Sequence, residues 1–277
     1  MAAVTFDPGT PPADVLADDH LLAAWLAETA GRRLLEVRKT PDLGGKALKD
    51  AGDRAAHLLL MELLAAYRPD DAVLSEEARE THGDTARLRA DRVWIIDPLD
   101  GTREFSELPR EDWAVHVALW QRTGPDSGAL AAGAVSQPAL AAADVPSTFH
   151  TGTPPVVPPR DQSARPRIAV SRSRPPAFVA ALAEEIGAEL VPMGSAGVKM
   201  MSVVRDLTDA YVHAGGQYEW DSAAPVAVAE AAGLFASRID GSPLLYNQQD
   251  VYLPDLVVCR PELAERILAF VAEHGAG

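Results

Sequence analysis

Three acidic segments of this 277-residue chain carry the side chains best suited to hold a metal ion. They are Glu76-Glu77, Asp97-Pro98-Leu99-Asp100-Gly101-Thr102 and Trp220-Asp221. Carboxylate oxygens are hard ligands that suit Mg²⁺, and backbone N–H groups beside a glycine can bind an anion such as phosphate. The three segments together therefore predict one metal site that performs phosphoryl chemistry.

The middle segment follows an apolar run at residues 93–96 that is typical of a buried strand. Pro98 fixes φ and has no N–H for a ladder bond, so we expect the chain to turn there. Gly101 permits a close backbone approach to an anion. Asp97 and Asp100 are then close enough to share cations. Asp-Pro and Asp-Gly also occur in ordinary turns, so the other acidic segments carry much of the prediction.

The spacing of apolar residues predicts the elements that must position these side chains. In the first half we expect helices at 21–34 and 55–67 and strands at 73–75, 93–96, 113–120, 130–135 and 141–145. In the second half we expect strands at 167–170, 189–191, 209–212 and 255–259, alternating with helices at 175–186, 198–204, 222–232 and 261–274. The fold class is therefore α/β. A Pro-rich segment at 146–166 divides an α+β metal-binding half (1–150) from an α/β half (160–277).

Composition excludes several other classes of protein. The net charge is −15 and no basic stripe is visible, which argues against a nucleic-acid partner, whereas bound Mg²⁺ would let an acidic pocket accept phosphate. No apolar run is long enough to cross a membrane, and residues 1–12 lack the features of a secretory signal. The single cysteine, Cys259, lies in an apolar run and forbids an internal disulfide, so we expect a cytoplasmic protein.

The motifs resemble those of the inositol monophosphatase superfamily of lithium-sensitive, Mg²⁺-dependent phosphatases. The segment from Asp97 to Phe105 (DPLDGTREF) looks like its first signature, and the segment from Trp220 to Pro225 (WDSAAP) looks like its second. Ser75-Glu76-Glu77 is similar to its upstream pair of metal-binding glutamates. The resemblance covers nearly the whole chain and implies a layered αβαβα sandwich of the sugar-phosphatase type.

Within the superfamily, the chain resembles bacterial, notably actinobacterial, 3′(2′),5′-bisphosphate nucleotidases. Glu104 stands where inositol monophosphatases usually carry Asn, and Ser171-Arg172-Ser173 is similar to a Ser-Arg-Ser-His segment, with Arg174 in place of the His. The resemblance implies hydrolysis of 3′-phosphoadenosine 5′-phosphate (PAP) to AMP in sulfate assimilation, with the sulfonated donor PAPS, which would give APS, left open. The alternatives are inositol 1-phosphate, fructose 1,6-bisphosphate and a metal-regulated binding protein without catalysis. A homodimer is also left open.

The resemblance implies roles for residues of the metal site. Glu76, Asp97, Thr102 and the Leu99 carbonyl would surround one Mg²⁺, and Asp97, Asp100 and Asp221 a second, with a third, weaker ion near Glu76. Asp53 would polarise Thr102, and the pair would orient the attacking water, so Asp53, Thr102 and Glu76 are the predicted catalytic residues. An acid at the start of a helix also favours the helix dipole, which is the other explanation for Asp53.

The same resemblance implies a set of substrate-binding residues. The amides of Gly101 and Thr102, together with Asp221, would contact the phosphoryl group. Gly194, Ser195 and Lys199 resemble the family's substrate wall, although Lys199 equally suits a solvated helix surface. Ser171, Arg172 and Ser173 would cradle a second phosphate, or they form a strand-to-helix turn with a serine cap. We expect a structural role for His116, because no second histidine lies at metal-ligand spacing.

Overall fold

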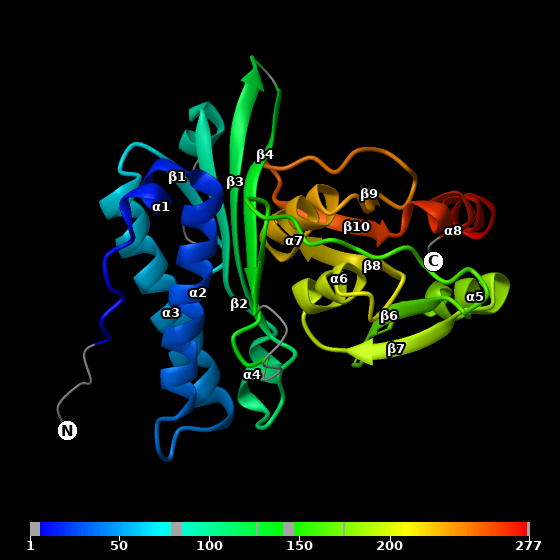
Figure 1. Ribbon diagram of the computed structural model, residues 1–277, viewed down its shortest axis with the longest axis horizontal. Helices are drawn as coiled ribbons and strands as arrows, with labels where there is room; N and C mark the ends of the chain where they lie inside the picture. Colours follow the sequence, from blue (N-terminus) through cyan, green and yellow to red (C-terminus); the bar gives the residue numbers. More distant parts are fainter. Residues whose placement is uncertain (1–5, 79–84, 126, 141–146, 174, 276–277) are drawn as a thin grey trace.

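Two five-stranded sheets, each drawn from one stretch of the chain, form the framework of the protein. The computed structural model describes residues 6–78, 85–125, 127–140, 147–173 and 175–275. Figure 1 shows the layers in order: a helical layer, the first sheet, a second helical layer, the second sheet and a third helical layer. The expected α/β class and the layered αβαβα sandwich are thereby confirmed.

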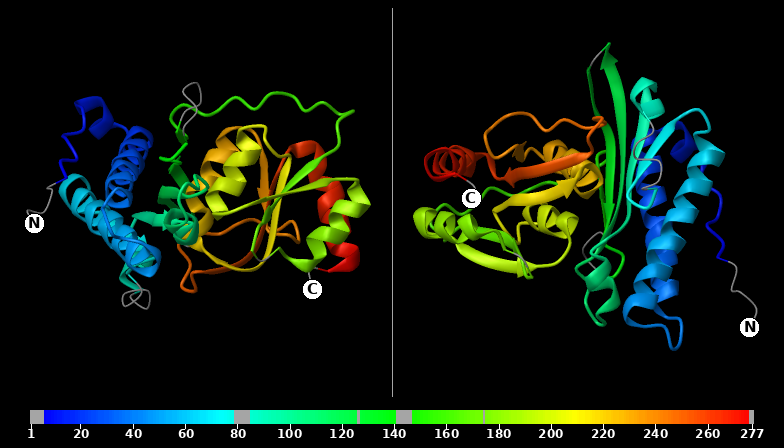
Figure 2. Two further views of the ribbon diagram at one scale, coloured as in Figure 1. Left: turned by 90° about the horizontal axis from the view of Figure 1, so that it is seen from below. Right: turned by 180° about the vertical axis from the view of Figure 1, so that it is seen from behind.

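The first sheet has the order β1-β2-β3-β4-β5, in which β1 and β2 are parallel and the other neighbours antiparallel. Its strands are β1 (Ala72–Ser75), β2 (Arg92–Asp100), β3 (Ala114–Gly124), β4 (Ser127–Ser136) and β5 (Thr148–His150). Helices α1 (Ala13–Ala17), α2 (Asp19–Arg38) and α3 (Gly45–Tyr67) lie on its outer side (Figures 1 and 2). A short 3₁₀ helix, η2 (Thr85–Arg89), precedes β2, and α4 (Thr102–Ser106) follows it. Because helices cover both faces, β2 is buried from Val93 onward and β3 from Ala114 to Trp120, and so both strands carry apolar residues on both faces.

The second sheet has the order β7-β6-β8-β10-β9. Its strands are β6 (Arg167–Ser171), β7 (Glu189–Met193), β8 (Ala210–Tyr218), β9 (Phe235–Ser237) and β10 (Tyr252–Cys259). Strand β6 runs parallel to β7 and β8, whereas β10 is antiparallel to β8 and β9. Helices α5 (Ala177–Ile186) and α8 (Pro261–His274) cover its outer face, and α6 (Ala196–Val204) and α7 (Glu219–Ala231) lie between the two sheets.

The central helical layer joins the two sheets into one core. Every residue of α6 is buried, and ten residues of α7 are buried, as expected for helices covered on all sides. One cluster of buried apolar residues contains Ile95 of β2, Met200 of α6, Val228 of α7 and Val258 of β10. Since this core continues across both parts of the chain, the division into halves at 1–150 and 160–277 stays a prediction.

Several expected elements differ from the observed ones. Helix α3 begins at Gly45, not at residue 55, with Gly44 as its N-cap residue. Strand β2 continues to Asp100, since the pairing with β3 is irregular between Asp97 and Asp100 and so accommodates Pro98. Strand β9 was not expected, and the strand expected at 141–145 lies outside the described residues. No helix in the described ranges is long and apolar enough to span a membrane.

Candidate active site

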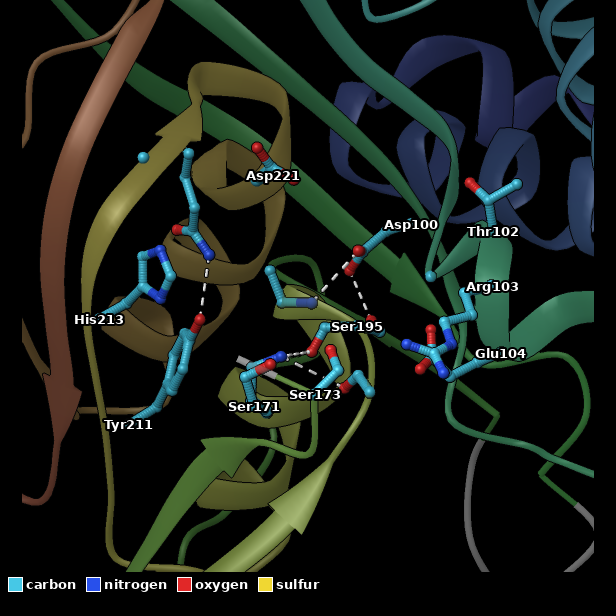
Figure 3. Close-up of a pocket in the computed structure, with 16 residues that line it drawn as sticks. Asp100, Thr102, Arg103, Glu104, Ser171, Ser173, Ser195, Tyr211, His213 and Asp221 are labelled. Atoms are coloured by element: carbon cyan, nitrogen blue, oxygen red, sulfur yellow. Dashed lines mark hydrogen bonds between the residues drawn. The ribbon is translucent and has the colours of Figure 1, made fainter. Parts of the chain in front are cut away.

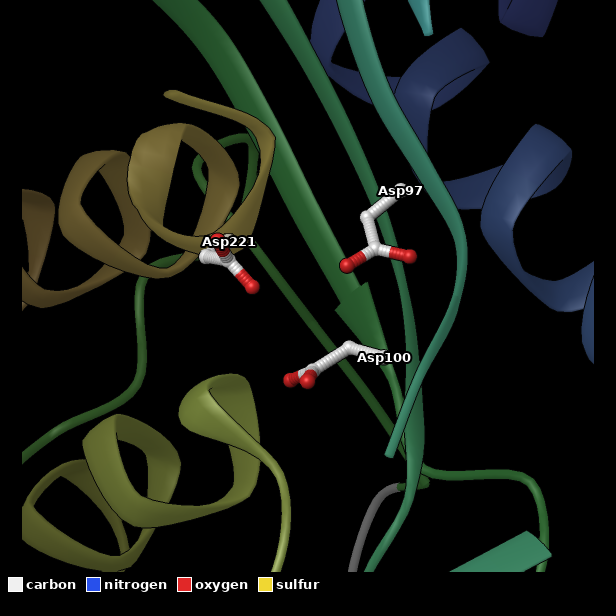
Figure 4. Close-up of side chains that lie close together, drawn as sticks. All are labelled: Asp97, Asp100 and Asp221. Atoms are coloured by element: carbon white, nitrogen blue, oxygen red, sulfur yellow. The ribbon is translucent and has the colours of Figure 1, made fainter. Parts of the chain in front are cut away.

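Three aspartates from distant segments meet between the two sheets. Asp97 and Asp100 lie at the end of β2, and Asp221 lies in the first turn of α7. One carboxylate oxygen of each lies within 4.8 Å of the others, and Figure 4 shows the three side chains converging on one space. The middle and third acidic segments of the sequence therefore meet between the two sheets.

The electrostatics of this cluster favour a cation. Burial, followed by the charges of Glu76 and Asp100, raises the pKa of Asp97 well above its usual range. Burial, followed by the charge of Asp100, raises the pKa of Asp221 to about 7. Among the described residues, no lysine or arginine forms an ion pair with Asp97 or Asp221. A divalent cation would relieve this repulsion, so the donor set fits a metal ion.

Glu76 joins the cluster from the turn after β1. Its carboxyl group hydrogen-bonds with that of Asp97, and burial raises the pKa of Glu76 to about 7. Its neighbour Glu77 is exposed, although the Glu77 charge still contributes to the raised pKa of Glu76. The paired glutamates therefore separate into one cluster member and one solvent-facing residue.

Asp100 is fixed by the start of α6. Its carboxylate accepts hydrogen bonds from Ser195 Oγ (2.5 Å), Ala196 N (3.2 Å) and Gly197 N (2.7 Å). Burial alone would raise the pKa of Asp100, but His116, Ser195 and Lys199 lower that pKa to about 2. Ser195, which was expected on the substrate wall, therefore also orients a member of the acidic cluster.

Thr102 and Asp53 face each other at the edge of the cluster. Thr102 Oγ1 lies 3.5 Å from Asp53 Oδ1 and 3.2 Å from the Leu99 carbonyl oxygen. Burial and then the charge of Glu77 raise the pKa of Asp53 to about 7, while the hydrogen bond from Thr102 opposes this shift. Asp53 lies in the interior of the 23-residue helix α3, so the helix-dipole explanation for it is wrong.

One oxygen of Asp221 serves the backbone of its own helix. Asp221 Oδ2 accepts a hydrogen bond from the N–H of Tyr218, the N-cap residue of α7, at 2.7 Å. This bond satisfies an N–H at the helix start and fixes the carboxylate plane. The other oxygen is left to face Asp97 and Asp100.

A cavity of about 490 Å³ opens beside the cluster. Figure 3 shows its lining, which includes most of the residues predicted to bind substrate: Gly101, Thr102, Ser171, Ser173, Gly194, Ser195, Lys199 and Asp221. A further wall comes from β8, the strand next to β6, and includes Tyr211, His213, Gly216 and Gln217. Sequence reasoning missed this wall, because the only local signal is the pair Gly215-Gly216, both with positive φ, where the strand bends.

Two predicted substrate residues are engaged with the protein itself. Arg172 is absent from the cavity lining and donates from Nε to Glu104 and from Nη2 to Glu107, each at 2.7 Å. Lys199 is buried, and its ammonium group donates to the carbonyls of Gly194 and Ser195, so the solvated-surface alternative for Lys199 is wrong. Arg174, which stands in place of the resemblance's His, lies outside the described residues.

Comparison with known proteins agrees with this geometry. The Inositol monophosphatase family profile matches residues 22–276. A Mycobacterium leprae protein named 3′-phosphoadenosine 5′-phosphate phosphatase is 50% identical over 271 residues, which cover 92% of this chain and 94% of the relative. The 3′(2′),5′-bisphosphate nucleotidase CysQ of Escherichia coli K12 is 31% identical over 234 residues, covering 82% of this chain and 94% of the relative.

The fold has solved counterparts as well. The crystal structure of CysQ from Bacteroides thetaiotaomicron, titled a bacterial member of the inositol monophosphatase family, superposes with a TM-score of 0.71 at 26% identity. That comparison covers 86% of this chain and 96% of the solved one. The match to the family profile, the two signatures and the shared fold lead to one assignment. The chain belongs to the inositol monophosphatase family.

Proposed function

We propose that this enzyme is a Mg²⁺-dependent phosphomonoesterase that hydrolyses PAP to AMP and phosphate. The observation that carries the proposal is the 490 Å³ cavity that opens directly beside the Asp97, Asp100 and Asp221 carboxylates. The 50% identity to a protein named PAP phosphatase supports the nucleotide as substrate. PAPS, which would give APS, remains a second substrate to test.

The acidic cluster would hold the metal ions. Glu76, Asp97, Thr102 and the Leu99 carbonyl would hold one Mg²⁺, and Asp97, Asp100 and Asp221 would hold a second. A third, weaker ion would lie near Glu76. When bound, the ions supply a lowered pKa for the attacking water and charge neutralisation at the phosphate and the leaving oxygen. The cluster itself supports this assignment, because its carboxyl groups are buried together and, among the described residues, no lysine or arginine is bonded to Asp97 or Asp221.

The chain's own residues would orient water and substrate. The Thr102 hydroxyl has one proton and faces two acceptors, Asp53 and the Leu99 carbonyl. When it donates to Asp53, its lone pairs are available to accept a hydrogen bond from water, which would orient that water for in-line attack. The amides of Gly101 and Thr102 would bind the phosphoryl oxygens, and the positive φ of 84° at Gly101 permits that backbone conformation.

The wall formed by β8 would receive the nucleoside. Tyr211, His213 and Gln217 present two rings and an amide to the cavity, across from Thr102 and Glu104 (Figure 3). Rings and amide groups suit a purine, whose faces are apolar and whose edges hydrogen-bond. We further propose a cytoplasmic location, consistent with a single buried cysteine, and leave a homodimer as a state to be measured.

The proposal is tested by phosphate release from PAP, PAPS, inositol 1-phosphate and fructose 1,6-bisphosphate, with Mg²⁺ or with EDTA and with or without Li⁺. We expect the highest kcat/KM for PAP, loss of activity in EDTA and inhibition by Li⁺. The Asp97→Asn protein, purified in parallel, controls for contaminating phosphatases. Preference for either sugar phosphate would overturn the substrate assignment, and release unaffected by EDTA would overturn the metal assignment.

A further inference from the structure

His116 is a fully buried side chain that the proposed reaction does not use. Its backbone belongs to β3, and its fully buried ring contacts the helices that lie between the two sheets. Its Nδ1 lies 3.1 Å from the carbonyl oxygen of Trp220. Because a carbonyl oxygen can only accept, Nδ1 donates its proton there. The ring thereby contacts the residue that directly precedes Asp221.

The other ring nitrogen faces a different member of the acidic cluster. His116 Nε2 lies 3.3 Å from Asp100 Oδ2. In the sheet register, His116 is also the direct partner of Asp97 across the β2–β3 pair. One rigid ring therefore spans the gap between the β2 end, which carries Asp97 and Asp100, and the start of α7, which carries Asp221.

The neighbouring helix leaves a space for this ring. A Cβ atom at Gly197 would lie 2.0 Å from His116 Nε2 and 2.7 Å from its Cε1. Real Cβ atoms do not approach so closely, and both contacts are to a ring that is held on two sides. Gly197 N also donates to Asp100 Oδ2 at 2.7 Å. Glycine at position 197 therefore lets α6 bind Asp100 and accommodate the imidazole at the same place.

We propose that His116 is a positioning residue that presets the separation between the β2 carboxylates and Asp221, with Gly197 as its steric complement. The inference rests on the proposed function, in that the cluster binds Mg²⁺. Residues that orient metal ligands commonly change metal affinity or activity by about 10- to 100-fold when they are replaced. A residue that only fills the core would instead change stability and leave the affinity of the folded protein unchanged.

The primary test is Mg²⁺ binding by isothermal titration calorimetry, with thermal unfolding in EDTA as a separate measure of folding. His116→Leu keeps the bulk and removes both nitrogens, so we expect Mg²⁺ binding about tenfold weaker or more. His116→Asn places an amide nitrogen near the position of Nδ1 and should recover part of the affinity through the Trp220 carbonyl. Val117→Ala, the next residue on β3 and part of the outer core, is the matched control, with lower stability and unchanged affinity.

A double-mutant cycle measures the coupling between His116 and Gly197. Gly197→Ala should weaken Mg²⁺ binding more in the wild-type background than in His116→Asn, because Asn lacks the two ring atoms that an added methyl group would meet. Additive effects would overturn the steric pairing, and unchanged affinity in folded His116→Leu would overturn the positioning role. Absence of Mg²⁺ binding by the wild-type protein would instead count against the proposed metal site itself.

Discussion

Two groups of buried carboxylates in this protein have opposite surroundings. Asp209, at the end of the second sheet, is 1% exposed and is bonded by Arg167 (N, 2.8 Å; Nε, 3.2 Å) and by Arg260 (Nε, 3.1 Å). Asp97, at the end of β2, is also 1% exposed, yet its nearest charged neighbours are the carboxylates Glu76 and Asp100. The two aspartates are therefore equally buried, but Asp209 is neutralised by arginines whereas Asp97 lies among other carboxylates.

The difference indicates what each group does. A buried acid bonded by two arginines is satisfied within the protein, so Asp209 ties the ends of β6, β8 and β10 together. Buried acids facing one another raise the free energy of the metal-free fold and lower it again only when a cation arrives. Burial alone therefore does not distinguish a functional carboxylate from a structural one, whereas the sign of the nearest charge does.

The largest effect should come from changing the charge at the cluster. Asp97→Asn removes a carboxylate assigned to both Mg²⁺ ions, so we expect turnover of PAP to fall by roughly a thousandfold, about 4 kcal/mol of barrier. The same change relieves repulsion, so the melting temperature in EDTA should equal or exceed that of the wild type. Steady-state kinetics and calorimetry check both results, and near-normal turnover would contradict the assignment.

Replacing Asp209, the acid bonded by arginines, should have the opposite effect to Asp97→Asn: stability should fall and activity should be kept. Asp209→Ala leaves Arg160, Arg167 and Arg260 without their buried partner, and we expect a loss of about 3–5 kcal/mol in the free energy of unfolding. The folded fraction should keep the wild-type KM and Mg²⁺ affinity, because Asp209 lies away from the cavity lining. Urea denaturation measures the loss. If Asp209→Ala instead lowered kcat and left stability intact, the structural role assigned to Asp209 would be contradicted.

Glu104 offers an intermediate case, since it is a buried acid on the cavity wall that is paired with Arg172. Arg172→Met would leave the Glu104 charge beside an anionic substrate, so we expect KM for PAP to rise about tenfold, or roughly 1.4 kcal/mol, with kcat little changed. The double variant Arg172→Met/Glu104→Gln should restore most of KM. No restoration would indicate that Arg172 binds the phosphate directly, as the sequence predicted.

The sequence predicts the residues of the acidic cluster better than it predicts the contacts those residues make with distant segments. Asp97, Asp100, Asp221 and Glu76 could be recognised from short motifs, because each motif is local and its residue types specify the chemistry. Whether Arg172 faces the substrate or Glu104 depends on a contact between α4 and the β6 turn, which no local pattern encodes. The sequence predicted a strand at 113–120, which overlaps β3 (Ala114–Gly124), but the partners of His116 could be found only once α7 was known to cover that face.

The smallest effect concerns pH. Burial raises the pKa values of Glu76, Asp53 and Asp221 to about 7, so the folded metal-free protein binds more protons than the unfolded chain at acidic to neutral pH. Stability in EDTA should therefore fall as the pH rises from about 6 to about 8, and Mg²⁺ should stabilise more strongly at the higher pH. Melting curves with and without Mg²⁺ measure this. If the protein in EDTA became more stable between about pH 6 and about pH 8, the predicted direction of the pH dependence would be contradicted.

The hydrogen bond between Asp221 and the Tyr218 N–H couples ion binding to a helix–coil equilibrium. Each time the first turn of α7 frays, the carboxylate loses the bond that orients it, and the cluster loses a ligand at the same moment. By thermodynamic reciprocity, an ion bound at the cluster must then reduce that fraying to the same degree. Amide hydrogen exchange at the start of α7 should consequently slow when the site is filled, which makes a backbone proton a reporter of metal occupancy.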